Sequence, residues 1–148
     1  MAARAPWFKD GLRFTCTQCS HCCTGEPGVI YLSEADADAM AGRLGMDPAG
    51  FRARYCVSVH ARGRRWLSLR DRPDATHGHA CVMWAEGVGC TVYEQRPRQC
   101  RTWPFWRRIV ADPAAWAAEA AQCPGMGHGR LHTAAAIAAT AADDGLPR

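Results

Sequence analysis

The feature that most constrains this chain is a run of four cysteines within eight residues, Cys16 to Cys23, in the pattern C-x-x-C-x-x-C-C. Thiols packed this densely are not needed to fill a core, whereas thiolates are good ligands for zinc and for iron–sulfur clusters. The sequence contains nine cysteines in 148 residues. The run therefore predicts a metal site that the more distant cysteines complete.

The number of cysteines and the start of the chain argue against a disulfide scaffold. Nine is an odd number, so at least one thiol would stay unpaired. The segment from Met1 to Asp10 has no apolar stretch suited to a secretory signal, and no segment approaches the roughly 20 apolar residues that span a membrane. We therefore expect a cytoplasmic protein with no membrane partner, in a compartment where structural disulfides are rare.

The positive charge of the chain has an explanation close to the cysteines. The net charge is +4 at pH 7, carried by arginine, and the arginines are scattered, so we expect no nucleic-acid partner. Thiolates around a metal leave a net negative charge that guanidinium groups beside the sulfurs can offset. The arginines placed for this role are Arg13, Arg96, Arg98 and Arg101.

Local patterns predict a small, metal-stabilised α+β domain with short helices, two short hairpins and irregular loops around the metal site. Residues 29–32 are typical of a short strand. Ser33 and Asp36 then form a capping box for a helix over 34–44. Asp47-Pro48 starts a second short helix that ends near Tyr55.

The rest of the chain alternates short strands, loops and helices. Residues 57–60 and 66–69 alternate with period two around Arg62-Gly63, which predicts a hairpin, and residues 70–79 are polar enough to predict a loop. The further predictions are a strand pair at 81–84 and 90–93, a helical turn at 94–99, and helices at 114–122 and 131–144. We assign residues 1–130 to one cysteine-cluster metal-binding domain and residues 131–148 to an alanine-rich C-terminal helix and tail.

The spacing of the cysteines leaves the metal open. Cys16 and Cys19 form one C-x-x-C knuckle of the kind that binds zinc, but no second compact knuckle follows. C-x-x-C-x-x-C is also the spacing with which one loop binds three irons of a [4Fe–4S] cluster, while a remote cysteine binds the fourth. We expect the adjacent Cys22 and Cys23 to point apart and to serve different sites or to bridge two metals. The spacing favours an iron–sulfur cluster slightly over zinc.

Other residues near the cysteines are predicted to have supporting roles. Cys56 lies in an apolar context between a helix and a strand, so we expect a buried thiol rather than a ligand. His21 lies inside the cysteine run, where we expect it to support a sulfur rather than to bind the metal. The histidines in glycine-rich loops, which we expect to be solvated, are His77, His79 and His128.

Taken in order, these motifs resemble the YkgJ-type cysteine-cluster family, to which zinc or iron chelation is attributed. The match includes C-x-x-C-x-x-C-C, the segment from Cys90 to Phe105, and Cys123-Pro124-Gly125, and it covers residues 14–129. The resemblance implies that Cys56 is not a ligand. The ligands that it implies are Cys16, Cys19, Cys22, Cys23, Cys81, Cys90, Cys100 and Cys123.

The sequence therefore favours a metal-binding protein that uses an iron–sulfur cluster or zinc for redox, sensing or metal handling, with a protein redox or client partner. One alternative is a cluster-dependent transferase, because the cluster is similar to that of flagellin lysine N-methylases, which use S-adenosylmethionine. The chain has no G-x-G-x-x-G loop and no nucleophile–base pair, so we predict no catalytic residues. The other alternative is a zinc-stapled interaction module that grips a partner with Trp103, Phe105 and Trp106.

Overall fold

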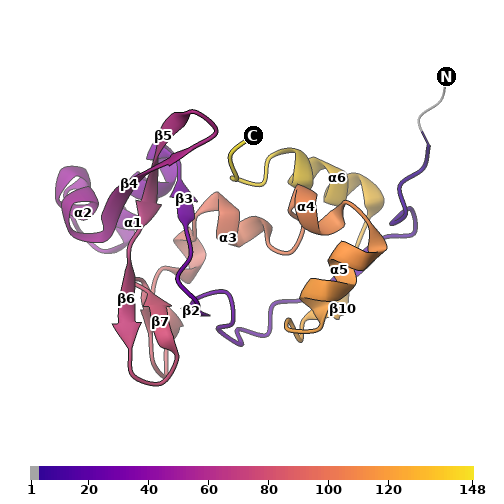
Figure 1. Ribbon diagram of the computed structural model, residues 1–148, viewed down its shortest axis with the longest axis horizontal. Helices are drawn as coiled ribbons and strands as arrows, with labels where there is room; N and C mark the ends of the chain where they lie inside the picture. The colour runs from indigo at the N-terminus through magenta and orange to yellow at the C-terminus, as the bar shows by residue number, and fades with distance from the viewer. Residues whose placement is uncertain (1–3) are drawn as a thin grey trace. The chain divides into compact units, whose positions relative to one another are not determined.

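The structure is a computed structural model that describes residues 4–148. Within them the chain forms short helices and small antiparallel sheets of two or three strands, which confirms the predicted small α+β class (Figure 1). The first three residues of the predicted 1–130 domain lie outside the described residues. The chain divides into two compact units: unit 1 comprises the described residues up to Cys19 together with Thr102–Asp144, and unit 2 comprises Ser20–Arg101 and Gly145–Arg148.

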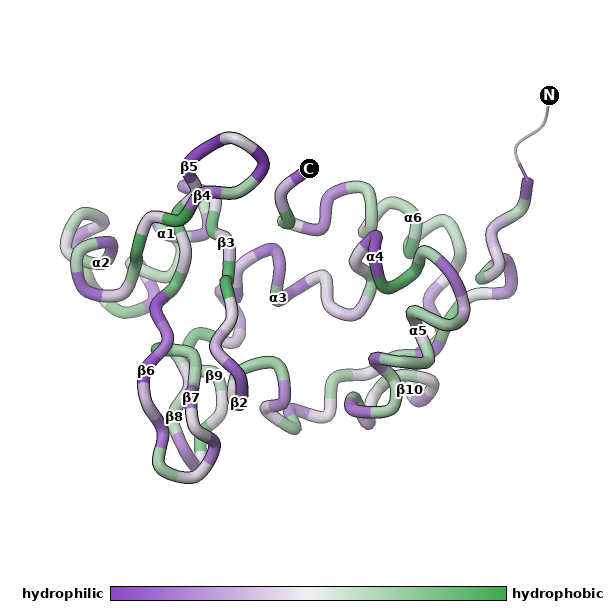
Figure 2. Tube along the Cα trace, in the orientation of Figure 1, coloured by the Kyte–Doolittle hydropathy of each residue, from purple (hydrophilic) through white to green (hydrophobic). Residues whose placement is uncertain are grey.

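One half of unit 2 is a three-stranded sheet covered by two helices. Its strands are β3 (Ile30–Leu32), β5 (Arg64–Leu69) and β4 (Cys56–Ala61), in the order β3-β5-β4, and its helices are α1 (Glu34–Arg43) and α2 (Pro48–Tyr55). The hairpin predicted around Arg62-Gly63 is confirmed, since β4 and β5 pair up to Ala61↔Arg64. Figure 2 shows the hydrophobic stretch of β3 and the hydrophilic tip of the β4–β5 hairpin.

Both helix starts in this half follow the predicted signals. The Ser33 hydroxyl accepts from the Asp36 amide while the Asp36 carboxylate accepts from the Ser33 amide, which is the expected capping box. Asp47 caps α2, and Pro48 is its first residue. The faces that these helices bury meet the sheet in a core that includes Leu32, Met40, Phe51, Cys56 and Leu69.

The second half of unit 2 corrects the prediction of a loop over residues 70–79. β6 (Asp71–Asp74) and β7 (Gly78–Cys81) form a hairpin, and β2 (Thr24–Gly25) pairs with the other side of β7. The polar, proline-containing composition of residues 70–79 wrongly predicted a loop. Pro73 is tolerated in β6 because β6 is an edge strand, and its unpaired edge needs no amide donor. The turn is closed by the Asp74 carboxylate, which accepts from the amides of Thr76 and His77.

The segment that follows is more broken than predicted. β8 (Trp84–Ala85) and β9 (Gly89–Cys90) pair over only two residues each, in place of the longer strands expected. The single turn expected over 94–99 is split into a 3-10 turn η1 (Tyr93–Gln95) and the helix α3 (Arg98–Thr102). Pro97 lies between them. The residue before a proline is driven out of helical geometry, so the chain leaves the helical conformation at Arg96 and α3 starts after Pro97.

Unit 1 consists of a two-stranded sheet and three helices around an aromatic core. β1 (Leu12–Phe14) pairs with β10 (Met126–His132), and the helices are α4 (Arg107–Val110), α5 (Pro113–Ala120) and α6 (Ala134–Ala142). The core consists of Phe8, Phe105, Val110, Ile137 and Ala141. No helix within residues 4–148 is long and apolar enough to cross a membrane.

The helix predicted over 131–144 is shorter at its start. The chain is still extended in β10 at His132, and α6 begins at Ala134 after Thr133, whose hydroxyl accepts from the Ala136 amide. Strand β10 was missed because it contains two glycines and no alternation of apolar and polar residues, so only its pairing with β1 makes it a strand. The domain boundary predicted after residue 130 stays a prediction.

Candidate metal centre

The predicted ligands are distributed over both units, and all nine cysteines are free thiols. Unit 1 contains Cys16, Cys19 and Cys123, and unit 2 contains Cys22, Cys23, Cys56, Cys81, Cys90 and Cys100. Cys56 is 4% exposed and packs in the core described above, where burial raises the pKa of its thiol. Its position agrees with the expectation of a buried cysteine that fills space.

The three thiols of unit 1 lie on segments that β-pairing connects. Phe14 of β1 is opposite Met126 of β10, and the amide of Thr15 donates to the carbonyl of Gly125 at 3.4 Å. This pairing ties the residues just before Cys16 to those just after Cys123. The amide of Gln18 donates to the Cys16 sulfur at 3.4 Å, as expected when a two-residue gap turns backbone amides toward a ligand.

The expectation that Cys22 and Cys23 point apart is wrong. Their sulfurs lie 3.8 Å from each other in a thiol–thiol hydrogen bond. This bond lowers the pKa of Cys22 to about 6, helped by the positive charge of Arg96, and it raises the pKa of Cys23. The pair therefore carries one easily formed thiolate, which is the form of cysteine that binds metals.

The other predicted ligands of unit 2 come from separate segments that lie within electrostatic reach of this pair. The amide of Cys81 donates to the carbonyl of Cys23 at 2.7 Å, and Cys90 pairs with Trp84 in the β8–β9 ladder. Negative charge on Cys22 acts on the thiols of Cys81, Cys90 and Cys100, so all three lie within its electrostatic reach. Burial raises the pKa of Cys81 to about 12 and also raises those of Cys90 and Cys100.

Arg96 is the arginine whose positive charge acts on the pKa values of these thiols. Its guanidinium stacks on Tyr93, 3.8 Å from the ring centroid, and its Nε donates to the Tyr93 carbonyl. From there its charge lowers the pKa of Cys22 and opposes the effect of burial at Cys90 and Cys100. The charge of Arg96 therefore acts on three of the predicted ligands, and the expected donation from an arginine to a ligand sulfur stays a prediction.

Other arginines named for this role have different contacts. Arg101 forms an ion pair with Asp36 at 3.4 Å and donates from Nε to the carbonyl of Arg96. Arg13 donates to the carbonyl of Gly129. The Arg101 side chain thus links the backbone carbonyl of Arg96 to Asp36 in α1.

Helix α3, which carries Cys100, is fixed to β3 by a side chain that sequence reasoning missed. The Gln99 side chain is buried, its Oε1 accepts from the Tyr31 amide at 2.8 Å, and its Nε2 donates to the Val29 carbonyl at 2.9 Å. The amide side chain thereby satisfies the free edge of β3 as another strand would. The only sequence signal was a polar residue beside Cys100.

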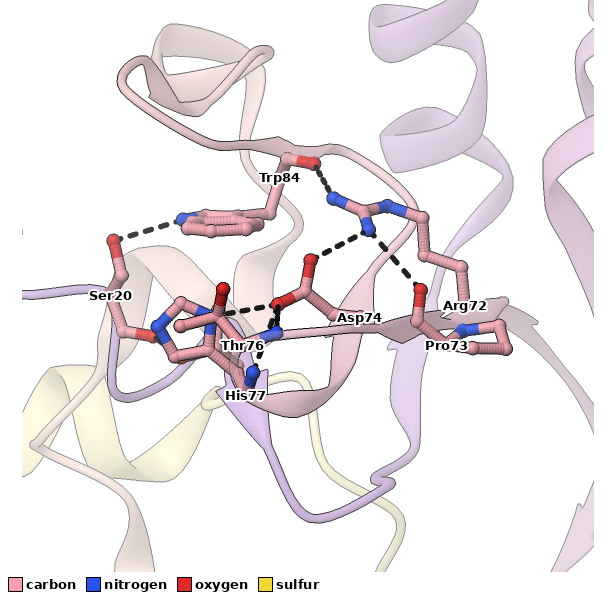
Figure 3. A network of polar contacts seen from close by, with 8 residues as sticks. Ser20, Arg72, Pro73, Asp74, Thr76, His77 and Trp84 are labelled. Atoms are coloured by element: carbon pink, nitrogen blue, oxygen red, sulfur yellow. Dashed lines mark hydrogen bonds and ion pairs between the residues drawn. The ribbon is translucent and has the colours of Figure 1, made fainter.

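A second set of missed residues lies beside the cysteine run (Figure 3). The indole Nε1 of Trp84 donates to the hydroxyl of Ser20, and the ring of His77 packs edge-on against the indole. Nδ1 of His77 is 2.8 Å from the Asp74 carboxylate, so this histidine is not the freely solvated one that we expected. An aspartate three residues before a histidine in a turn was the signal available.

The donor set of unit 2 fits a thiophilic metal. Within residues 4–148, no three Cys, His, Asp or Glu side chains are gathered closely enough to hold an ion as they stand. Zinc–sulfur bonds are about 2.3 Å long, so the sulfurs would have to draw inward on binding. The thiol donors, the low pKa of Cys22 and the positive charge of Arg96 are chemically suited to such a metal.

No solved structure matches the chain. A family model does match it, over residues 15–124, and this span contains all eight predicted ligands. The description of the family is "CxxCxxCC: Putative zinc- or iron-chelating domain". Since the match covers more than half of the chain, the protein belongs to the CxxCxxCC family.

Proposed function

We propose that the protein is a metal-binding protein whose cysteines other than Cys56 are ligands. Of these eight, unit 2 contains Cys22, Cys23, Cys81, Cys90 and Cys100, and unit 1 contains Cys16, Cys19 and Cys123. An iron–sulfur cluster is our first choice of metal group and zinc our second, because the cysteine run has the three-ligand spacing of a cluster loop. We assign its use to redox, sensing or metal handling with a protein partner, in the cytoplasm.

The observation that carries this proposal is the mutual influence of the unit 2 thiols. Four chain segments bring Cys22, Cys81, Cys90 and Cys100 within electrostatic reach of one another, with Arg96 acting on all of these sulfurs except that of Cys81. Burying several thiols together brings no hydrophobic advantage over burying apolar side chains. A bound metal explains both the grouping and the cation, because thiolate ligands need charge compensation.

Anaerobic purification followed by metal and sulfide analysis and an absorption spectrum tests the proposal. A broad band near about 400 nm with bound iron and sulfide identifies a cluster, whereas a colourless protein with stoichiometric zinc identifies a zinc site. A wild-type protein that contains neither and binds neither Zn²⁺ nor a reconstituted cluster refutes metal binding.

A pair of alanine variants tests the ligand assignment. Cys100→Ala removes a thiol of the proposed group and should lower the metal content per protein. Cys56→Ala removes a thiol of similar size from the core of the same unit and should leave the metal content unchanged. Equal losses in both variants would show that metal content follows folding rather than ligation.

A further inference from the structure

Ser20, within the cysteine run, has a backbone conformation that needs support from its surroundings. Its φ is 71°, in the left-handed region that residues other than glycine seldom occupy. Its carbonyl accepts from the amides of Cys23 and Thr24, each at 3.0 Å, and from the Thr24 hydroxyl at 2.8 Å. This turn sets the direction in which the chain enters Cys22 and Cys23. Such strain persists only where neighbouring groups hold it, and it concentrates at functional sites.

The side chain of Ser20 is held from a distant part of unit 2. The indole Nε1 of Trp84 donates to the Ser20 hydroxyl at 2.9 Å, across 64 residues of sequence. Trp84 is 6% exposed and pairs with Cys90 in the β8–β9 ladder, and it lies three residues after Cys81. One hydrogen bond therefore connects the turn before Cys22 to the segment that carries Cys81 and Cys90.

Trp84 is in turn held by a partly exposed ion-pair network (Figure 3). The Arg72 guanidinium lies 5.7 Å from the indole centroid and donates to the Trp84 carbonyl at 2.9 Å. The His77 ring contacts the indole edge-on, with 5.2 Å between centroids. Asp74, whose side chain is 11% exposed, fixes both residues: its Oδ1 accepts from Arg72 at 3.1 Å, and its Oδ2 is 2.8 Å from His77 Nδ1.

We propose that Trp84 and Ser20 are positioning residues that hold Cys22 and Cys23 toward Cys81 and Cys90 and so set how tightly the metal is bound. This inference rests on the proposed function, since it assigns a task to the surroundings of the same thiols. The physical reason is preorganisation. Ligands that are already held near their bound positions lose less conformational freedom when the ion arrives.

The test is competition for Zn²⁺ between the reduced, metal-free protein and a chromophoric chelator under anaerobic conditions. Trp84→Phe keeps an aromatic ring against Arg72 and His77 but removes the N–H donor. Ser20→Ala removes the acceptor, whereas Ser20→Asn supplies an oxygen acceptor and tolerates the left-handed conformation. Trp66→Phe is the matched control, because Trp66 donates from Nε1 to the Ala61 carbonyl in the β4–β5 hairpin.

We expect Trp84→Phe and Ser20→Ala to weaken Zn²⁺ binding by about 10- to 100-fold, as is usual when support for a ligand is removed. Ser20→Asn and Trp66→Phe should bind as the wild type does. Wild-type affinity in both Trp84→Phe and Ser20→Ala overturns the inference and leaves the proposed function standing. A wild type that does not bind Zn²⁺ overturns the inference, and the proposed function falls with it only if the protein also binds no reconstituted cluster. If Trp84→Phe fails to fold, the comparison of Ser20→Ala with Ser20→Asn decides alone.

Discussion

Gln99 offers a direct test of how the proposed site is attached to the rest of unit 2. Its side-chain amide makes two backbone hydrogen bonds, one to Tyr31 of β3 and one to Val29 just before that strand, and the residue is 6% exposed. Gln99→Leu keeps the approximate size of the side chain and removes both bonds. The carbonyl of Val29 and the amide of Tyr31 then lose their hydrogen-bond partner, and the leucine side chain limits the access of water to both groups.

The cost follows from these two contacts. A hydrogen bond contributes about 0.5–1.5 kcal/mol net, and a buried polar group without a partner costs about 1–3 kcal/mol. Because both bonds are only partly buried, water recovers some of the loss, and we expect about 2 kcal/mol in the free energy of unfolding. For a chain of this size, that corresponds to a melting temperature lower by about 4–8 °C.

The assay is thermal unfolding followed by circular dichroism, with free Zn²⁺ buffered at one value so that the contribution of metal binding is common to all samples. Glu86→Leu replaces an exposed polar side chain of unit 2 with leucine and should leave the melting temperature within about 1 °C of the wild type. A Gln99→Leu protein as stable as Glu86→Leu would show that the edge of β3 does not need this side chain.

Three further predictions concern metal removal, acid and thiol reactivity. Chelation should raise amide hydrogen exchange in residues 14–30 and 80–125 but not in α6, whose core cluster contains none of the proposed ligands; unchanged exchange throughout would contradict a structural role for the metal. In the metal-free protein, hydrogen bonds from His77 and Arg72 lower the pKa of Asp74 from 3.8 to about 2, so the stability that this carboxylate contributes is complete above about pH 4 and is lost as the pH falls through 2. Asp74→Asn should therefore flatten stability between pH 4 and 2 in urea titrations, and a slope like that of the wild type would count against the network. Iodoacetamide at pH 7 should modify Cys22 before Cys81, because the pKa of Cys22 is about 6 and that of Cys81 about 12; peptide mapping that finds the reverse order would refute this.

The parts of the fold that were predictable from sequence have causes within a few residues of one another. The capping box of Ser33 and Asp36, the Asp47-Pro48 start and the turn at Arg62-Gly63 each form from neighbouring side chains and backbone. Their geometry is therefore almost independent of the remaining chain. The same holds for Cys56, whose apolar neighbours in the sequence indicated its buried position.

The elements that were missed depend on partners far away in the sequence. β10 is rich in glycine and polar residues and becomes a strand only beside β1, and β6 contains a proline that an edge position tolerates. Gln99 contacts β3 across about seventy residues of sequence. No local pattern marks such a side chain, because its role is decided by the backbone groups that it meets after folding.

The cysteine run shows how remote pairing changes the interpretation of a compact motif. Its spacing indicates one loop around one cluster, but the two compact units meet in sequence between Cys19 and Ser20. On one side, the pairing Phe14↔Met126 ties the run to the segment of Cys123; on the other, Thr24↔Ala80 brings Cys23 to the segment of Cys81. The eight-residue motif thus places thiols in both compact units, because each of its ends continues a strand with a different partner. Strand pairing decides which remote cysteine-bearing segment each end of the run is tied to, and the spacing of the cysteines alone does not encode that pairing.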